Sequence, residues 1–244
     1  MLLDILRVRV KQGFRTMAYP DGPLPALPDR FAGLPVVDQD RCSLCPGHCL
    51  SSCPVGAIEK NGALTIDLGL CLFCRECQRA CPFGVLSFGS DHRLGSSSRE
   101  GLISSGDGAP PLALNERAAG LYGQVFSLRV VSAGGCGACE ADVNVLNTLA
   151  WDLGRFGINY GASPRHCDGM ILIGPVTPNM EEAVIETYRA IPEPKFVIAV
   201  GTCTVTASSR EDFPVPVDLY IPGCPPHPLT ILDGMLRFLG KVEE

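Results

Sequence analysis

The sequence predicts an α/β protein built from two unlike parts, an α+β part followed by a part with a parallel sheet. Residues 36–90, the cysteine-rich part, hold eight of the thirteen cysteines among short strand-like pieces. In residues 123–244, the parallel-sheet part, apolar runs alternate with helical patterns. Strands that are separated by helices form parallel sheets with covered faces, so we expect such a sheet in the second part.

The composition is typical of a globular protein, because hydrophobic residues make up 46% of the chain and charged residues only 19%. The net charge of −6 argues against a partner that is a nucleic acid or an anionic membrane. No apolar run reaches the roughly 20 residues of a membrane-spanning helix. Asp4 and Arg7 interrupt the apolar N-terminus, which also lacks the cleavage site of a secretory signal. We therefore expect a soluble, cytoplasmic chain whose cysteines bind metal rather than form disulfides, because that compartment keeps thiols reduced.

Two segments lie outside these parts. Residues 1–35 begin with an apolar and basic stretch and end in a stretch where four prolines forbid a helix, so we expect an extended arm. Residues 91–122 include GSSSREGLISSGDGAPP, which is typical of a linker. Between them, the cysteine-rich part is expected to form strands at Leu64–Asp67 and Val85–Phe88.

In the parallel-sheet part, four apolar runs predict buried strands: Val125–Val131, Met170–Ile173, Phe196–Val200 and Leu219–Ile221. Thr177 and Pro178 predict the start of a helix after the second of these runs. Leucines at helical spacing predict a last helix near the C-terminus: Leu229, Leu232, Leu236 and Leu239. In such an architecture, sites form in the loops beyond the carboxyl ends of the strands.

The cysteine-rich part contains an internal repeat, RCSLCPGHCLSSCP (41–54) and LCLFCRECQRACP (70–82). The second copy is the bacterial ferredoxin pattern C-x2-C-x2-C-x3-C-P, in which three thiolates hold one 4Fe–4S cluster and the fourth reaches the other cluster. By that rule the first cluster would be held by the first set, Cys42, Cys45, Cys49 and Cys81. The second cluster would be held by the second set, Cys71, Cys74, Cys77 and Cys53.

The first copy departs from this pattern, because three residues rather than two separate Cys45 from Cys49. Gly47 can relieve the backbone of such a bulge, and His48 can come near the sulfurs. A zinc ribbon is the alternative for paired cysteines, but it does not explain the cysteine–proline repeats. Upstream, GFRTMAYP and FAGLP resemble the ferredoxin-like subunits of complex I and of formate hydrogenlyase-type hydrogenases, which implies an arm that docks on neighbouring subunits.

Four further cysteines follow predicted strands: Cys136 and Cys139 in GGCGACE, Cys203 in VIAVGTC and Cys224 in YIPGCPP. If the strands are parallel, these loops open on the same edge of the sheet, and glycines beside each cysteine let the backbone approach a bulky group. Four thiolates suit an iron–sulfur cluster or zinc. A thioredoxin-like C-x-x-C pair would leave Cys203 and Cys224 without a role, and a phosphate-binding loop would need a lysine that is missing.

The segments GCGACE, SPRHCDGMILIGPVTPNMEEAVIETYRAIPEPKFVIAVGTC and VDLYIPGCPP resemble the small subunit of group 4 membrane-bound nickel–iron hydrogenases and the related 20 kDa-type subunit of complex I. The resemblance covers residues 123–244. It implies a flavodoxin-like domain with one 4Fe–4S cluster near the active site of a larger partner subunit. The ligands in that family match the third set, which is Cys136, Cys139, Cys203 and Cys224.

Three details refine this resemblance. The C-x-x-C spacing is that of the hydrogenases, whereas the complex I subunit has adjacent cysteines. Glu140 is a candidate proton relay or, alternatively, a carboxylate favoured by the start of a helix. Only twenty residues separate Cys203 from Cys224, where the relatives carry a longer glycine-rich loop. Other residues are expected to play structural roles: Cys167 as a buried filler, His227 as a surface residue at a helix start, and Trp151 and Tyr160 in packing or interfaces.

The expected function is that of an electron-transfer subunit with three 4Fe–4S clusters, without a catalytic site of its own. The expected partners are a hydrogenase-type or complex I-type large subunit, membrane-embedded subunits of the same assembly and a soluble redox donor, with no nucleic acid. The chain would then lie on the inner face of the cell membrane through those partners. The alternative is a free-standing ferredoxin-type electron carrier with a metal-binding docking domain.

Overall fold

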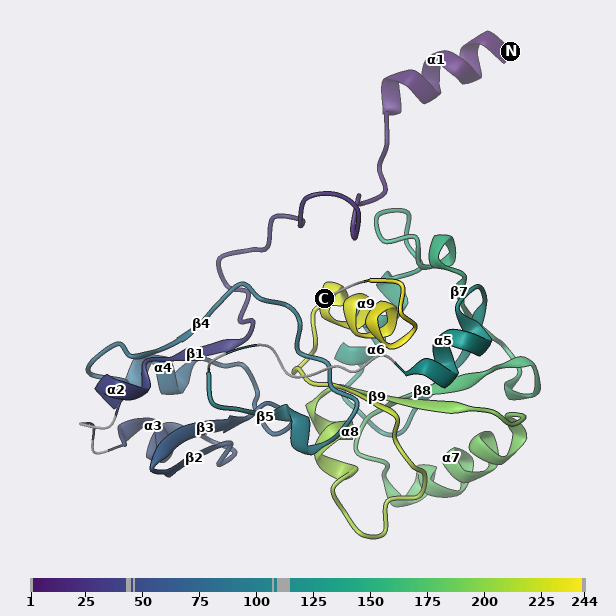
Figure 1. Ribbon diagram of the computed structural model, residues 1–244. Helices are drawn as coiled ribbons and strands as arrows, with labels where there is room; N and C mark the ends of the chain where they lie inside the picture. The colour runs from purple at the N-terminus through teal and green to yellow at the C-terminus, as the bar shows by residue number, and fades with distance from the viewer. Residues whose placement is uncertain (1, 43–44, 46, 107, 109–114, 243–244) are drawn as a thin grey trace.

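A computed structural model describes residues 2–42, 45, 47–106, 108 and 115–242. The strands of these residues form three sheets, and helices pack around them (Figure 1). The largest sheet contains β6 (Phe126–Ser132), β7 (Ile158–Tyr160), β8 (Gly169–Ile173), β9 (Phe196–Val200) and β10 (Leu219–Ile221). Its strands are all parallel and follow the order β10-β9-β8-β6-β7. This is the flavodoxin-like order, so the predicted fold class of the parallel-sheet part is confirmed.

The four predicted strands of this sheet are present, and most residues of their apolar runs are buried, whereas Val125 precedes β6 and is exposed. Every residue of β8 and β9 is buried, which explains why their sequences are apolar throughout instead of alternating. The sequence contains no signal for β7, the short edge strand, because its three residues Ile158, Asn159 and Tyr160 form no apolar run.

Helices cover both faces of the large sheet (Figure 1). One face carries α5 (Glu116–Tyr122), α6 (Ala138–Val145) and α9 (Pro228–Phe238), and its core includes the four predicted leucines of the last helix. The other face carries α7 (Pro178–Ala190) and α8 (Thr202–Ala207). Two short 3-10 helices, Leu153–Phe156 and Pro164–His166, flank β7.

The cysteine-rich part forms two small antiparallel sheets around its helices. β1 (Pro35–Val37) pairs with β4 (Leu86–Phe88), while β2 (Ile58–Asn61), β3 (Ala63–Asp67) and β5 (Ile103–Ser104) form the other sheet. The helices are α2 (Gln39–Cys42), α3 (His48–Ser52) and α4 (Glu76–Ala80). Both α3 and α4 begin after a left-handed residue, Gly47 and Arg75 respectively, so the two copies of the cysteine repeat have similar local structures.

The segments expected to be an arm and a linker contain regular structure. Residues 2–12 form a helix, α1 (Leu2–Gln12), which stands away from the rest of the molecule and buries none of its residues (Figure 1). The proline-rich stretch after it has no helix, as expected. In the segment 91–122, Ser96 bridges to Tyr220 of β10, residues 100–102 form a 3-10 helix, and β5 adds a strand to the sheet of the cysteine-rich part.

The two parts share a hydrophobic core. Ala199 of β9 and Val205 of α8 pack in the same buried cluster as leucines and cysteines of the cysteine-rich part. Arg99 adds a bidentate ion pair with Asp67, with N–O distances of 2.8 and 2.6 Å, and its Nε donates to Ser209 at 3.0 Å. Because bidentate arginine–carboxylate pairs fix orientation as well as distance, this pair helps to set how the two parts meet.

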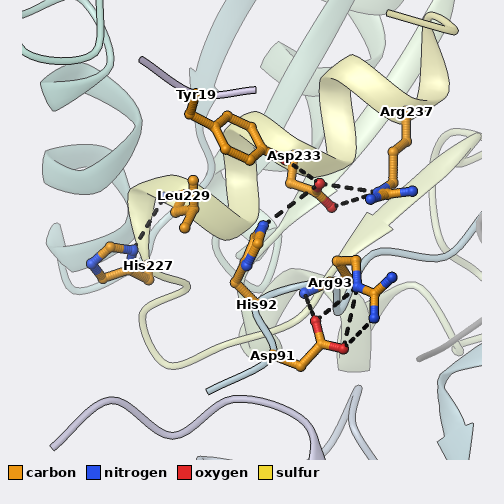
Figure 2. A network of polar contacts seen from close by, with 8 residues as sticks. All are labelled: Tyr19, Asp91, His92, Arg93, His227, Leu229, Asp233 and Arg237. Carbon is orange, nitrogen blue, oxygen red and sulfur yellow. Dashed lines mark hydrogen bonds and ion pairs between the residues drawn. The ribbon is translucent and has the colours of Figure 1, made fainter. Parts of the chain in front are cut away.

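A buried polar network connects three segments that are distant in the sequence (Figure 2). Asp233 of α9 is 1% exposed and accepts a hydrogen bond of 2.5 Å from the hydroxyl of Tyr19 in the arm. Arg237 donates to both Asp233 oxygens at 3.0 Å, and Nε2 of the buried His92 lies 3.7 Å from Oδ1. At the rim of this network, the more exposed Arg93 pairs with Asp91.

Burial alone would raise the pKa of Asp233, but the nearby His92, the hydrogen bond from Tyr19 and the charge of Arg237 outweigh it and hold the pKa below its usual range. A carboxyl group whose pKa is lower in the folded state stabilises the fold at pH values above its unfolded pKa. This contribution is lost as the pH falls below about 4, the ordinary pKa of aspartate, and then passes the lower pKa that Asp233 has in the folded protein.

We predict that Asp233→Asn lowers the free energy of unfolding by about 3 kcal/mol at neutral pH, because it leaves Arg237 without its counter-charge in a buried site. Asp91→Asn is the matched control and should cost less than about 1 kcal/mol, because that pair is partly exposed to solvent. Denaturant unfolding followed by circular dichroism measures both. As the pH falls, the free energy of unfolding should also decrease less in Asp233→Asn than in the natural protein. Equal destabilisation of Asp233→Asn and Asp91→Asn at neutral pH would contradict this account.

Candidate iron–sulfur sites

The first set comes together from both copies of the repeat. Burial raises the pKa of the Cys42 thiol, Lys60 opposes this effect, and the nearby Cys45 and Cys81 raise the pKa further. Burial also raises the pKa of Cys49, to which Cys42, Cys45 and Cys81 add. Thiols affect one another in this way only over short distances, so the four cysteines of the first set lie near one another.

Backbone N–H groups point at the sulfurs of this set. The N–H of Gly47 donates to Sγ of Cys45 at 3.4 Å. Although burial raises the pKa of Cys81, the backbone N–H groups of residues 83–86 outweigh it and hold the pKa below its usual value. Hydrogen bonds of this kind stabilise a thiolate and therefore suit a cysteine that acts as a metal ligand.

The cysteines of the second set also lie near one another. Burial raises the pKa of Cys71 to about 12, and Cys77, Cys53 and Cys74 contribute to the increase. A small apolar cavity lies among all four cysteines, with Ile66 and Phe88 in its wall. The N–H of Ala57 donates to Sγ of Cys53 at 3.2 Å, and that of Phe73 donates to Sγ of Cys71 at 3.3 Å.

The third set lies at the carboxyl edge of the large sheet, in the segments that follow β6, β9 and β10. Cys139 and Cys203 lie in the first turns of α6 and α8. Burial raises the pKa of Cys139 to about 12, with further contributions from Cys224, Glu140, Cys203 and Cys136. Cys136, Cys203 and Cys224 are exposed, whereas Cys139 is half-buried. This set is therefore open towards solvent on one side.

Glycines allow the loops of the third set to approach one another. Gly201 has a φ of +93°, and a Cβ atom built on it would lie 2.6 Å from Sγ of Cys139. Gly223 has a φ of +143°, and its Cβ would lie 2.4 Å from Pro226. Side chains at these two positions would push the ligand loops apart, which is the physical reason for glycine there.

The chemistry of these donors fits iron–sulfur clusters. Each set offers four thiols, and N–H groups or glycine backbone lie against the sulfurs, as a bulky inorganic group requires. Among the residues that the structure describes, no three His, Cys, Asp or Glu side chains are arranged to hold a single metal ion. A four-iron cluster is wider than one ion and holds its thiolates further apart.

Glu140 directly follows Cys139 of the third set, whereas Cys167 precedes β8 at the opposite edge of the large sheet. Ser132 donates a hydrogen bond to Oε1 of Glu140, and Oε2 is buried with no hydrogen bond to any described residue. A proton-relay role for Glu140 stays a prediction. Cys167 is 1% exposed and donates to the carbonyl of Ser163 at 3.3 Å, in agreement with the predicted buried filler.

The prediction that His227 lies at a helix start is confirmed, because it is the N-cap residue of α9, but its side chain is half-buried rather than on the surface. Its Nδ1 accepts a hydrogen bond from the N–H of Leu229 at 3.1 Å, and its ring packs edge-on against Phe31 and Trp151. Burial lowers the pKa of its imidazole. The sequence contains no sign of this packing, because Phe31 belongs to the arm and Trp151 to a distant loop.

Lys60 also belongs to this site, although it lies outside both copies of the cysteine repeat. Its ammonium group donates to the carbonyl oxygens of Cys42 and Cys45 at 2.9 and 2.8 Å. The repeat contained a signal for it, because Lys60 lies seven residues after Cys53, and the equivalent residue after Cys81 is the apolar Phe88. The surroundings of the first and second sets therefore differ by one positive charge at this position.

In the parts of the chain that the structure covers, no helix has both the length and the apolar character needed to cross a membrane.

Family models match both parts of the chain. The family described as "NADH ubiquinone oxidoreductase, 20 Kd subunit" matches residues 136–238, and the "4Fe-4S dicluster domain" matches residues 41–85. The strands, helices and cysteines described above lie largely within these two ranges.

Known proteins are similar to part of this chain. A Pyrococcus furiosus protein described as "Probable membrane-bound hydrogenase subunit mbhJ" is 37% identical over 121 residues, which are 46% of this chain and 72% of that protein. NAD(P)H-quinone oxidoreductase subunit K 2 of a Synechocystis species is 44% identical over 102 residues, which are 38% of this chain and 47% of the relative. In a solved archaeal respiratory complex, the membrane-bound sulfane sulfur reductase, one chain is 33% identical with a TM-score of 0.42, covering 48% of this chain and 70% of that one.

Two findings agree on the family. The chain matches 72% of the hydrogenase subunit at 37% identity, and the 20 kDa-subunit family model matches residues 136–238. The chain belongs to the family of the 20 kDa subunit of NADH ubiquinone oxidoreductase and carries, ahead of that region, a 4Fe–4S dicluster domain.

Proposed function

We propose that this chain is an electron-transfer subunit with three 4Fe–4S clusters, one for each set of cysteines. The observation that supports this proposal is the gathering of twelve of the thirteen cysteines into three groups of four. When bound, each cluster would accept or donate one electron at a time. The chain itself would hold the clusters, exclude water from them and adjust their potentials by burial, charge and hydrogen bonds to sulfur.

We infer that the second set lies between the other two. Cys49 of the first set is close enough to raise the pKa of Cys77 in the second set. On its other side, the loop that carries Cys71 contacts α8, where Cys203 of the third set lies. This succession supports a continuous path for electrons along the molecule, from residues 36–90 to the carboxyl edge of the large sheet.

The open side of the third set is the proposed face for a large partner subunit, in which the substrate would react. The relatives are described as subunits of a membrane-bound hydrogenase and of an NAD(P)H-quinone oxidoreductase. We propose an assembly of this kind, in particular one that resembles a group 4 hydrogenase. The chain would then associate peripherally with the membrane through membrane-embedded partners, and a soluble redox donor would supply or receive electrons at the cysteine-rich part.

Metal analysis of the anaerobically purified chain tests the number of clusters. We expect about twelve irons with matching acid-labile sulfide per chain, because each cluster holds four irons. Cys203→Ser should lower the iron content to about eight. Cys167→Ser is the matched control and should leave it unchanged, because Cys167 is the one cysteine outside the three sets. Zinc in place of the third group of irons would contradict the proposal.

We also predict that Lys60→Met lowers the midpoint potential of one cluster, because removing a positive charge beside the first set disfavours the extra electron. Lys195→Met is a suitable control, because Lys195 also donates to two backbone carbonyls, at 2.9 and 3.2 Å, but lies beside α7 and away from the cysteines. Redox titration followed by electron paramagnetic resonance measures the potentials. Equal potentials in the natural protein and in Lys60→Met would contradict this prediction.

A further inference from the structure

One buried hydroxyl group joins the loops of the second and third sets. Thr202 is the first residue of α8, directly precedes Cys203 and is 6% exposed. Its Oγ1 donates a hydrogen bond to the carbonyl oxygen of Cys71 at 3.0 Å and accepts one from the N–H of Gly223 at 3.4 Å. The N–H of Thr202 also donates to the carbonyl of Gly223 at 2.9 Å.

Each partner of Thr202 is part of a ligand loop. Cys71 belongs to the second set, and Gly223 directly precedes Cys224 of the third set. Thr202 therefore contacts the backbone of one set, directly precedes Cys203 of the other set and is hydrogen-bonded to the residue before Cys224. Within the described residues, these contacts form a continuous chain of covalent and hydrogen bonds from Cys71 to Cys203 and Cys224.

We propose that Thr202 is a positioning residue that holds the second set against the third set and provides the bonded path for electrons between them. This inference rests on the proposed function, because it requires a cluster at both sets. One electron moves, with no proton and no atom: the second site is oxidised by one electron and the third site is reduced by one, or the reverse. The rate of electron tunnelling falls less steeply with distance along covalent and hydrogen bonds than across a gap without bonds. Loss of the Thr202 hydroxyl therefore slows electron transfer between the two clusters.

The same helix offers a matched control. Thr206 of α8 donates through its Oγ1 to the carbonyl of Gly69 at 3.1 Å, so it also joins the two parts of the chain. Neither Thr206 nor Gly69 belongs to a set or directly adjoins a cysteine. Removing the Thr206 hydroxyl therefore perturbs the same interface without interrupting the chain of bonds from Cys71 to the third set.

The experiment uses the full chain with its clusters, purified anaerobically. A light pulse on a photoreductant delivers less than one electron per chain, and freeze-quench electron paramagnetic resonance follows how the electron redistributes between the clusters. The variants are Thr202→Val, Thr202→Ser and Thr206→Val, with Thr202→Ala as a smaller replacement if valine disturbs the loops. Iron content and equilibrium midpoint potentials are measured on the same samples, as readouts that do not depend on catalytic turnover.

We expect a several-fold slower redistribution in Thr202→Val, recovery in Thr202→Ser and no change in Thr206→Val, with iron content and potentials as in the natural protein. An unchanged rate in Thr202→Val, or an equal slowing in Thr206→Val, would overturn the role of Thr202 while leaving the proposed function intact. A shift in potential that fully accounts for the slower rate would also overturn it. Absence of a third cluster signal from the natural protein would overturn the proposed function and, with it, this inference.

Discussion

The fold has to hold four thiols close together in each of three places. Burial penalises the charge of a thiolate and neighbouring thiolates repel one another, so the pKa of Cys71 and that of Cys139 each rise to about 12. The chain offsets this cost locally with N–H groups directed at sulfur and with Lys60, which opposes the rise in the pKa of Cys42. These local effects do not suffice without loops held in place by a packed fold, because free loops would relax away from one another.

That packed fold is largely the parallel sheet with its helices. The cysteine-rich part is small, and short segments bury too little apolar surface to be stable alone. It extends its core by packing against Ala199 and Val205, and the ion pair between Arg99 and Asp67 fixes the orientation. The interface between the two parts therefore stabilises the cysteine-rich part and also places its second set of cysteines.

A second contact between segments, the network around Asp233, constrains the path of the arm. A buried carboxylate needs partners, and here Tyr19 from the arm and Arg237 from α9 supply them. Arg155 also donates to the carbonyl of Tyr19 at 2.6 Å, so the arm is held on two sides. Residues 2–12, in contrast, form a helix with no buried side chain, and the fold of the remainder does not depend on contacts with it.

The amino-acid sequence was enough to predict the strands with continuous apolar runs, the last helix and the cysteine repeat, because each of these depends on residues that are close together in the chain. It also indicated which loops open on the same sheet edge, since parallel strands place their carboxyl ends together. It did not reveal β7, the helix at residues 2–12 or the strand at Ile103–Ser104, because short elements depend on what they pack against. Nor could it identify Thr202, the network around Asp233 or the burial of His227. Each of these brings together groups that are far apart in the chain, such as Tyr19 and Asp233, which are separated by 214 positions. Which distant backbone and side-chain atoms come within hydrogen-bonding distance depends on how the elements pack together.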